Sequence, residues 1–173
     1  MNNWYMLTLV GKDRPGIVAR ISSALYQADC NLGEASMMRL GGNFTIMLMV
    51  KFPGSAKALD GVIRTEVESL GLQAHINPIE ARLHEHLVPD VRISVYGADR
   101  AGIVAQVTGA LAEAGLNILD LDSDVGGSAD KPIYIMTMEG RAQQGIEALR
   151  SALEVISRQG IHTHIEAIDT LIG

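Results

Sequence analysis

The chain has 173 residues, 47% of them hydrophobic, which is enough for one packed domain or two small ones. Its net charge is −6 and none of its 14 Lys and Arg residues belongs to a basic run, so we expect no direct contact with nucleic acid. No stretch reaches the roughly 20 apolar residues of a membrane helix, and the N-terminus lacks the layout of a signal peptide, which predicts a cytoplasmic protein without membrane contact.

One stretch of the chain occurs twice. The segments "GKDRPGIVARISSALYQADCNL" at 11–32 and "GADRAGIVAQVTGALAEAGLNI" at 97–118 are identical at 11 of 22 positions. This repeat predicts two similar domains, 1–80 and 91–173, joined by a polar linker at 81–90.

The first copy predicts six elements in the order strand, helix, two strands, helix and strand. Strand-forming residues cover 4–11, and the apolar side chains that follow recur at helical spacing until Asn31, which ends the helix. Gly41 and Gly42 suit the positive φ of a hairpin turn between two strands. An amphipathic helix over 55–71, closed by its last glycine, precedes the final strand.

The second copy predicts the same elements in the same order. A strand over 91–97 is followed by a helix that Asn117 ends, by a hairpin at Gly126 and Gly127, and by a helix over 142–160 closed by its last glycine. A further strand completes the copy. The order βαββαβ, found twice, predicts an α+β fold of two tandem ferredoxin-like domains, each an antiparallel four-stranded sheet with helices on one face.

The central strands are more apolar than this fold requires. Residues 44–50 are almost all apolar, on both sides of the strand, and 133–138 are nearly so in the second copy. Because the helices cover only one face of a sheet, we expect the other face to be covered by the other repeat or by a second subunit, and the protein to be a homo-oligomer.

The remaining chemistry-bearing residues predict neither a metal site nor a catalytic one. Cys30, the only cysteine, lies among apolar residues and is expected to be buried. His162, His164 and Glu166 alternate along one strand face, which supplies two metal ligands at most. No nucleophile motif or phosphate-binding glycine loop occurs, so we expect no metal, no cofactor and no enzymatic activity.

The segment from Asp120 to Asp130 holds much of the excess acid, all of which falls in the second half of the chain. It does not fit a calcium loop, since Val125 stands where such a loop needs glycine and Lys131 where it needs glutamate. We interpret its alternating aspartates as one solvated strand face, and the alternative is a face that docks a basic partner.

In both copies the βαββαβ order, the turn Gly-x-Asp-Arg-x-Gly and the asparagine after the first helix resemble the ACT domain, a small-molecule-sensing module. Two copies with almost nothing else resemble the glycine cleavage system transcriptional repressor family. The resemblance implies amino-acid ligands held where the turn after the first strand meets the first helix. Matched to the family's motif, the ligand-binding residues are Gly11, Asp13, Arg14, Pro15, Gly16 and Asn31 in the first copy and Gly97, Asp99, Arg100, Ala101, Gly102 and Asn117 in the second.

Physical chemistry favours the same place for a ligand. A helix N-terminus offers unpaired N–H groups and a positive dipole end to a carboxylate, and an aspartate beside it can accept hydrogen bonds from an ammonium group. Two alternatives remain for these residues: the aspartates act only as helix N-caps, and the arginines are solvated or paired with a nearby carboxylate.

The sequence and the resemblance together predict a regulatory protein that senses an amino acid such as glycine. Since direct DNA contact is not expected, control of transcription would pass through a protein partner, a DNA-binding transcription regulator. The alternative is a ligand-free or ligand-responsive regulatory or assembly subunit of an amino-acid metabolic enzyme, which the apolar central strands suggest.

Overall fold

The computed structural model describes residues 3–80, 87–98 and 102–168. The chain divides into two compact units, Met1–Glu85 and His86–Gly173, called unit 1 and unit 2 below. Part of the predicted linker, 81–86, lies outside the described residues. Within unit 2, Asp90 is tied to the sheet, because its backbone N–H donates to Gly140 at 2.9 Å and its Oδ1 accepts from the N–H of Ala142 at 2.9 Å.

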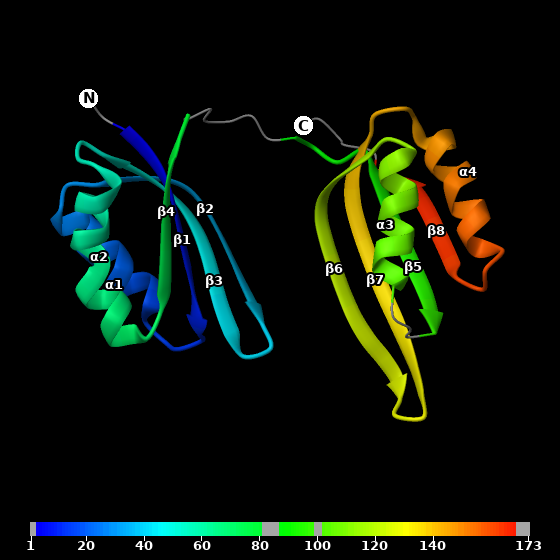
Figure 1. Cartoon of the computed structure of the whole chain (residues 1–173), viewed down its shortest axis with the longest axis horizontal. Coiled ribbons are helices and arrows are strands. Elements are labelled where there is room, and N and C mark those ends of the chain that lie inside the picture. Colours follow the sequence, from blue (N-terminus) through cyan, green and yellow to red (C-terminus); the bar gives the residue numbers. More distant parts are fainter. Residues whose placement is uncertain (1–2, 81–86, 99–101, 169–173) are drawn as a thin grey trace. The chain divides into compact units, whose positions relative to one another are not determined.

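Unit 1 contains the six predicted elements in the predicted order. They are β1 (Asn3–Lys12), α1 (Ile17–Gln27), β2 (Asn31–Leu40), β3 (Asn43–Phe52), α2 (Ala56–Leu70) and β4 (Gln73–Ile79). The sheet has the strand order β2-β3-β1-β4 with antiparallel pairing throughout, and both helices lie on one of its faces (Figure 1). The prediction of a ferredoxin-like fold is therefore confirmed for unit 1.

Unit 2 repeats this architecture. Its elements are β5 (Val91–Ala98), α3 (Ile103–Glu113), β6 (Leu116–Ser128), β7 (Lys131–Ala142), α4 (Ile146–Ser157) and β8 (His162–Ala167). The strand order β6-β7-β5-β8 matches that of unit 1, and all pairs are again antiparallel. The fold class predicted from the repeat is confirmed for both units.

The prediction that Asn31 and Asn117 end the first helix of each unit is wrong. In unit 1 the helix ends at Gln27, and Asp29 adopts a left-handed conformation with φ 54° that turns the chain into β2. In unit 2, Gly115 with φ 85° does the same after α3. Both asparagines therefore lie in strands.

The hairpin turn lies where the sequence predicts it in unit 1 but not in unit 2. Gly41 and Gly42 connect β2 to β3 with φ 57° and 75°, as predicted. In unit 2 the pairing of β6 with β7 continues to Ser128 opposite Lys131, so Gly126 and Gly127 lie inside β6 and not in the turn. The extra residues of the second copy lengthen this hairpin, and the pairing of β6 with β7 therefore continues beyond Gly126 and Gly127.

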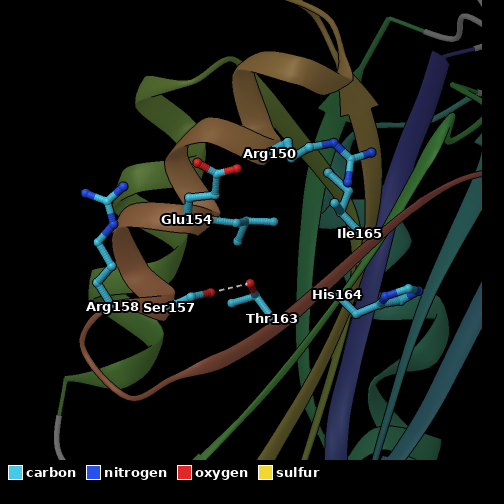
Figure 2. A pocket seen from close by; sticks show the side chains of 8 residues that line it. Arg150, Glu154, Ser157, Arg158, Thr163, His164 and Ile165 are labelled. Atoms are coloured by element: carbon cyan, nitrogen blue, oxygen red, sulfur yellow. Dashed lines mark hydrogen bonds between the residues drawn. The ribbon is translucent and has the colours of Figure 1, made fainter.

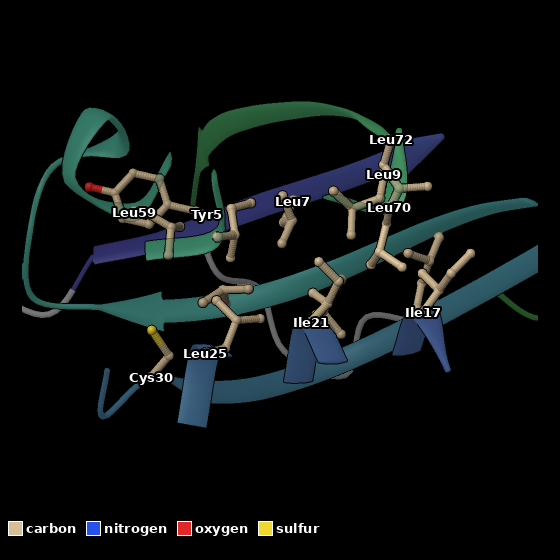
Figure 3. Packing of buried hydrophobic residues seen from close by; sticks show 14 of the residues in the cluster. Tyr5, Leu7, Leu9, Ile17, Ile21, Leu25, Cys30, Leu59, Leu70 and Leu72 are labelled. Carbon is tan, nitrogen blue, oxygen red and sulfur yellow. The ribbon is translucent and has the colours of Figure 1, made fainter. Parts of the chain in front are cut away.

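Each unit has its own hydrophobic core between its helices and its sheet. In unit 1 the apolar stripe of α1 packs on side chains from β1 and β3 (Figure 3). Leu59 of α2 is fully buried, and the hydroxyl of Tyr5 donates to the carbonyl of Gly54 at 2.6 Å at the edge of this core. The helical periodicity of the sequence thus predicts correctly which side of each helix is buried.

Cys30 belongs to the core of unit 1, as predicted, and its thiol is expected to react slowly. Burial, and secondarily the charge of Asp29, raise the pKa of the Cys30 thiol, so less of the reactive thiolate exists at neutral pH. We expect the folded protein to react with a disulfide reagent at least about 10-fold more slowly than the urea-unfolded chain. Absorbance kinetics measure both rates, with Cys30→Ala as the blank, and equal rates in the two states would contradict this expectation.

Candidate functional site

The turn between β1 and α1 forms one wall of an open cleft in unit 1. The cleft has a volume of about 430 Å³ and is lined by the turn itself, by the first residues of α1, and by the ends of β2 and β3. Its lining residues are Asp13, Arg14, Pro15, Gly16, Ile17, Val18, Ala19, Met37, Arg39 and Phe44.

Gly16 shapes the helix end that faces this cleft. It is the N-cap of α1 with φ 86°, a left-handed conformation that favours glycine, and no side chain caps the helix. A Cβ built on Gly16 meets no atom within 4 Å, so the backbone is open to close approach. The N–H groups of the first helical turn, which have no partners inside the helix, are therefore left for a ligand or for solvent.

Asp13 does not cap the helix, so the alternative of an N-cap is wrong for Asp13. Its carboxylate forms an ion pair with the guanidinium of Arg39, which comes from the end of β2. The backbone N–H of Asp13 donates to the carbonyl of Gly42 at 3.0 Å, which fixes the turn against the β2–β3 hairpin. The cleft thus presents one carboxylate, that of Asp13, and two arginines, Arg14 and Arg39, beside a helix N-terminus.

An apolar pocket of about 250 Å³ adjoins the cleft between α1 and β2. Ile17 and Val18 line both cavities, and the pocket continues over Ala35 to the core side chains Leu9 and Leu48. Because Ala35 and Met37 occupy alternate positions of β2, the two cavities lie along one side of the same strand. A ligand with a polar end at Asp13 and an apolar end toward Ala35 would match both cavities.

The structure brings only part of the predicted set together in unit 1. Asp13, Arg14, Pro15 and Gly16 line the cleft. Gly11 lies in β1, where a Cβ would approach the Leu72 side chain to 2.7 Å, so it serves packing and not the cleft lining. Asn31 follows the opposite end of α1, on the order of 15 Å along the helix from the turn, and unit 1 does not bring it to the cleft.

The predicted site of unit 2 is described in part. Asp99, Arg100 and Ala101 lie outside the described residues. Gly102 is the N-cap of α3, and no side chain caps this helix. Its φ of 86° is again one that favours glycine. Gly97 lies in β5 and Asn117 in β6.

Arg39 is the functional candidate that sequence reasoning missed, and it distinguishes the units. In unit 1, Phe44 of β3 pairs with Gly11 of β1 on one side and with Arg39 of β2 on the other. In unit 2, Tyr134 of β7 pairs with Gly97 of β5 on one side and with Val125 of β6 on the other. Val125 therefore occupies the position of Arg39 in unit 2. One feature of the sequence could have indicated Arg39: the predicted hairpin at Gly41 places the end of β2 near the turn between β1 and α1.

A second cleft, of about 550 Å³, lies between α4 and β8, and its polar side chains are less well placed to bind one ligand than those of the first cleft. Its two hydroxyls bond each other, Ser157 Oγ to Thr163 Oγ1 at 2.8 Å, and Arg150 approaches Glu147 at 3.4 Å. Figure 2 shows Arg150 and Arg158 pointing away from each other. These groups do not converge on a common point, and we assign no ligand to this cleft.

The other predicted features have simple structural counterparts. The aspartates at 120, 122 and 124 are exposed on β6, as a solvated strand face and a face that docks a basic partner both require. His164 Nε2 lies 3.8 Å from Glu166 Oε2. Within 3–80, 87–98 and 102–168, no three His, Cys, Asp or Glu side chains are grouped as metal ligands would be, and no helix is long and apolar enough to cross a membrane.

The fold and the cleft together define the class of protein. It has two tandem βαββαβ units, and unit 1 has a charged cleft at a helix N-terminus. Models of the ACT domain match residues 5–77 and 91–158, one in each unit. The chain belongs to the ACT-domain family and consists of two tandem ACT domains.

Two curated proteins are similar to this chain in sequence. A UPF0237 protein of Listeria innocua is 36% identical over 75 residues, which cover 41% of this chain and 83% of that protein. The glycine cleavage system transcriptional repressor of Escherichia coli is 25% identical over 122 residues, covering 70% of this chain and 64% of the repressor. The chain thus has a distant homologue that is a repressor, matched over somewhat less than two thirds of its length.

Among solved structures, an unknown protein from Galdieria sulphuraria superposes with a TM-score of 0.77. The match covers 97% of this chain and 99% of the other, at 23% sequence identity. At this identity the likeness extends to the fold alone.

Proposed function

We propose that this protein is a regulator that binds an α-amino acid in the cleft of unit 1 and transmits the bound state through contact with another protein. The observation that carries the proposal is the Asp13–Arg39 ion pair beside the uncapped N-terminus of α1. The ACT-domain matches support a ligand-responsive role, and the distant repressor homologue supports a role in transcription.

The cleft offers each end of a zwitterion a complementary group. The carboxylate of an amino acid would accept hydrogen bonds from Arg39 and from the first-turn N–H groups of α1, which also lie at the positive end of the helix dipole. The ammonium group would donate to Asp13, which the ion pair already holds at the mouth. The ligand would enter between two groups that are positioned before it arrives.

The apolar pocket gives the choice of amino acid a physical basis. An aliphatic side chain would extend over Val18 into the space beside Ala35, whereas glycine would leave that space empty. The name of the homologous repressor points to glycine, and the pocket points to a larger aliphatic amino acid. A ligand panel therefore has to contain both kinds.

Unit 1 is the proposed binding unit, because unit 2 has Val125 where unit 1 has Arg39. A valine supplies neither charge nor hydrogen bond to a carboxylate. Unit 2 would then serve contact with the protein partner. Since the net charge is −6, that partner and not this chain would hold the DNA.

Isothermal titration of the full chain tests the ligand site. Glycine, serine, leucine and phenylalanine are titrated into wild type and Asp13→Ala, and we expect one of them to bind wild type and to lose about 10-fold or more in affinity to the variant. Asp60→Ala is the matched control, because its carboxylate pairs with Arg64 on α2, away from the cleft.

Two results would contradict the proposed site: no heat with any of the amino acids, or equal affinity for wild type and Asp13→Ala. A pull-down with the full chain separates the proposal from the alternative role. A transcription regulator among the captured proteins supports it, and a catalytic subunit of an amino-acid metabolic enzyme favours an assembly subunit.

A further inference from the structure

A methionine lies in the wall of the cleft of unit 1. Met37 of β2 lines the cleft, whose apolar wall also includes Ile17, Val18 and Phe44. The side chain of Met37 is 51% exposed, so dissolved molecules reach its sulfur. A thioether in this place is open to oxidation, which an aliphatic side chain does not undergo.

Two further methionines of the described residues are exposed to a similar degree. Met38 is 57% exposed and Met47 is 49% exposed. By contrast, three methionines are at most 8% exposed, and these are Met49, Met136 and Met138. A dissolved oxidant therefore meets Met37, Met38 and Met47 before it meets the buried three.

Of the three exposed methionines, Met37 alone faces the helices. Its pairing partner on β3 is Ile46, which belongs to the core between the sheet and the helices. Successive side chains of a strand point to opposite faces, so Met38 lies on the face away from the helices. Met47 lies there too, because it follows Ile46 on β3. Met37 therefore borders the cleft, and the other two do not.

The fold does not require methionine at this position. Ile46 of β3 pairs with Met37 of β2, and at the matching position of unit 2 Met136 of β7 pairs with Ser123 of β6. Serine has no sulfur to oxidise. The thioether thus distinguishes unit 1, which has the cleft, from unit 2.

We propose that Met37 is a site of reversible oxidation through which a peroxide lowers the affinity of the cleft for its amino acid. This inference rests on the proposed function of the cleft. In the reaction a hydroperoxide transfers one oxygen atom to the thioether, so that an S–O bond forms and the O–O bond breaks. The sulfur loses two electrons and the peroxide gains them, and the remaining oxygen of hydrogen peroxide leaves as water.

The sulfoxide changes the cleft in two ways. It places a strong hydrogen-bond acceptor two residues before Arg39 on the same side of β2, on the order of 7 Å along the strand. There it competes with the carboxylate of the ligand for the guanidinium. It also puts a polar group where the cleft meets the pocket beside Ala35, against which an aliphatic ligand side chain would pack.

The single cysteine is a poor competitor for the oxidant. Cys30 is buried in the core of unit 1, and this burial raises the pKa of its thiol. Little of the thiolate that peroxides attack therefore exists at neutral pH. Mild peroxide treatment is expected to act on the exposed methionines.

Titration before and after oxidation tests the proposal. The full chain is treated with hydrogen peroxide, catalase destroys the excess, and peptide mass spectrometry follows the gain of one oxygen at each methionine. We expect wild type with oxidised Met37 to bind the best-binding amino acid of the panel at least about 5-fold more weakly. Methionine sulfoxide reductases, one for each epimer of the sulfoxide, should restore the affinity.

Two variants assign the effect to one sulfur. Met37→Leu nearly keeps the volume of the side chain and cannot form a sulfoxide, so its affinity should be the same before and after peroxide. Met38→Leu/Met47→Leu is the matched control. It removes two equally exposed thioethers from the other face, where unit 2 has Asp124 at the position of Met38, and it should lose affinity on oxidation as wild type does.

The outcomes separate this proposal from the proposed function. Equal affinity before and after oxidation of Met37 would overturn the proposal and leave the binding site standing. The same holds for a loss that Met37→Leu shares, for a loss that the reductases do not reverse, and for a Met37 that stays reduced while Met38 and Met47 are oxidised. If the untreated chain binds none of the amino acids, the proposed function fails, and its control by Met37 fails with it.

Discussion

Replacing Arg39 with valine is expected to weaken amino-acid binding by the full chain about 10- to 100-fold, although no residue of α1 or of the turn is changed. The substitution removes the charged donor that the carboxylate of the ligand would use. It also leaves Asp13 without its ion-pair partner, so that a carboxylate would then face an uncompensated negative charge. Because Val125 occupies the same strand position in unit 2, valine fits the local backbone.

Isothermal titration with the best-binding amino acid of the panel measures this loss. The control is Arg64→Val, which removes an arginine of α2 whose partner Asp60 is also on that helix. Unchanged affinity of Arg39→Val, with a normal melting temperature, would place the carboxylate elsewhere. The double variant with Asp13→Ala should cost less than the sum of the single variants, because each removes one half of the same pair.

Truncating Leu59 to alanine should have the largest effect on stability, about 2–5 kcal/mol in the free energy of unfolding of unit 1. Leu59 lies in the first turn of α2 and is 0% exposed, so the substitution leaves a cavity between that helix and the sheet. The chain contains a single tryptophan, Trp4, in β1. Its fluorescence during urea unfolding therefore reports on unit 1 alone.

Tyr26→Ala serves as the control for this measurement. It removes a larger side chain than Leu59→Ala does, but Tyr26 is 80% exposed on α1, so we expect a change within about 0.5 kcal/mol. The contrast separates burial from side-chain size. Similar losses in the two variants would mean that the core of unit 1 does not dominate its stability.

The two units also show how duplicated sequence can keep a fold while its surfaces diverge. Both units have glycine at the N-cap of the first helix, with φ 86° in each, a backbone conformation that glycine adopts without the steric cost that a Cβ brings. By contrast, Arg39 and Val125 differ at a strand position that either side chain can occupy. The glycine that fixes the backbone at the start of the first helix is thus shared, and the strand residue beside the cleft is not.

The sequence by itself determined the elements, their order and the repeat, because these depend on residues close together in the chain. Apolar side chains at helical or alternating spacing define α1 and β1, and Gly41 and Gly42 place a turn without reference to the rest of the molecule. The predicted turn between β1 and α1 was also found beside a cleft, since a helix N-terminus is a local feature.

Tertiary structure decided which of the predicted site residues meet. The register of β2 on β3 brings Arg39 to Asp13, and the length of α1 keeps Asn31 away from both. Register likewise aligned Met38 with the position that Asp124 holds in unit 2, which no single segment reveals. Such pairings join residues far apart in the chain, and their geometry follows from how the strands align and not from local propensity.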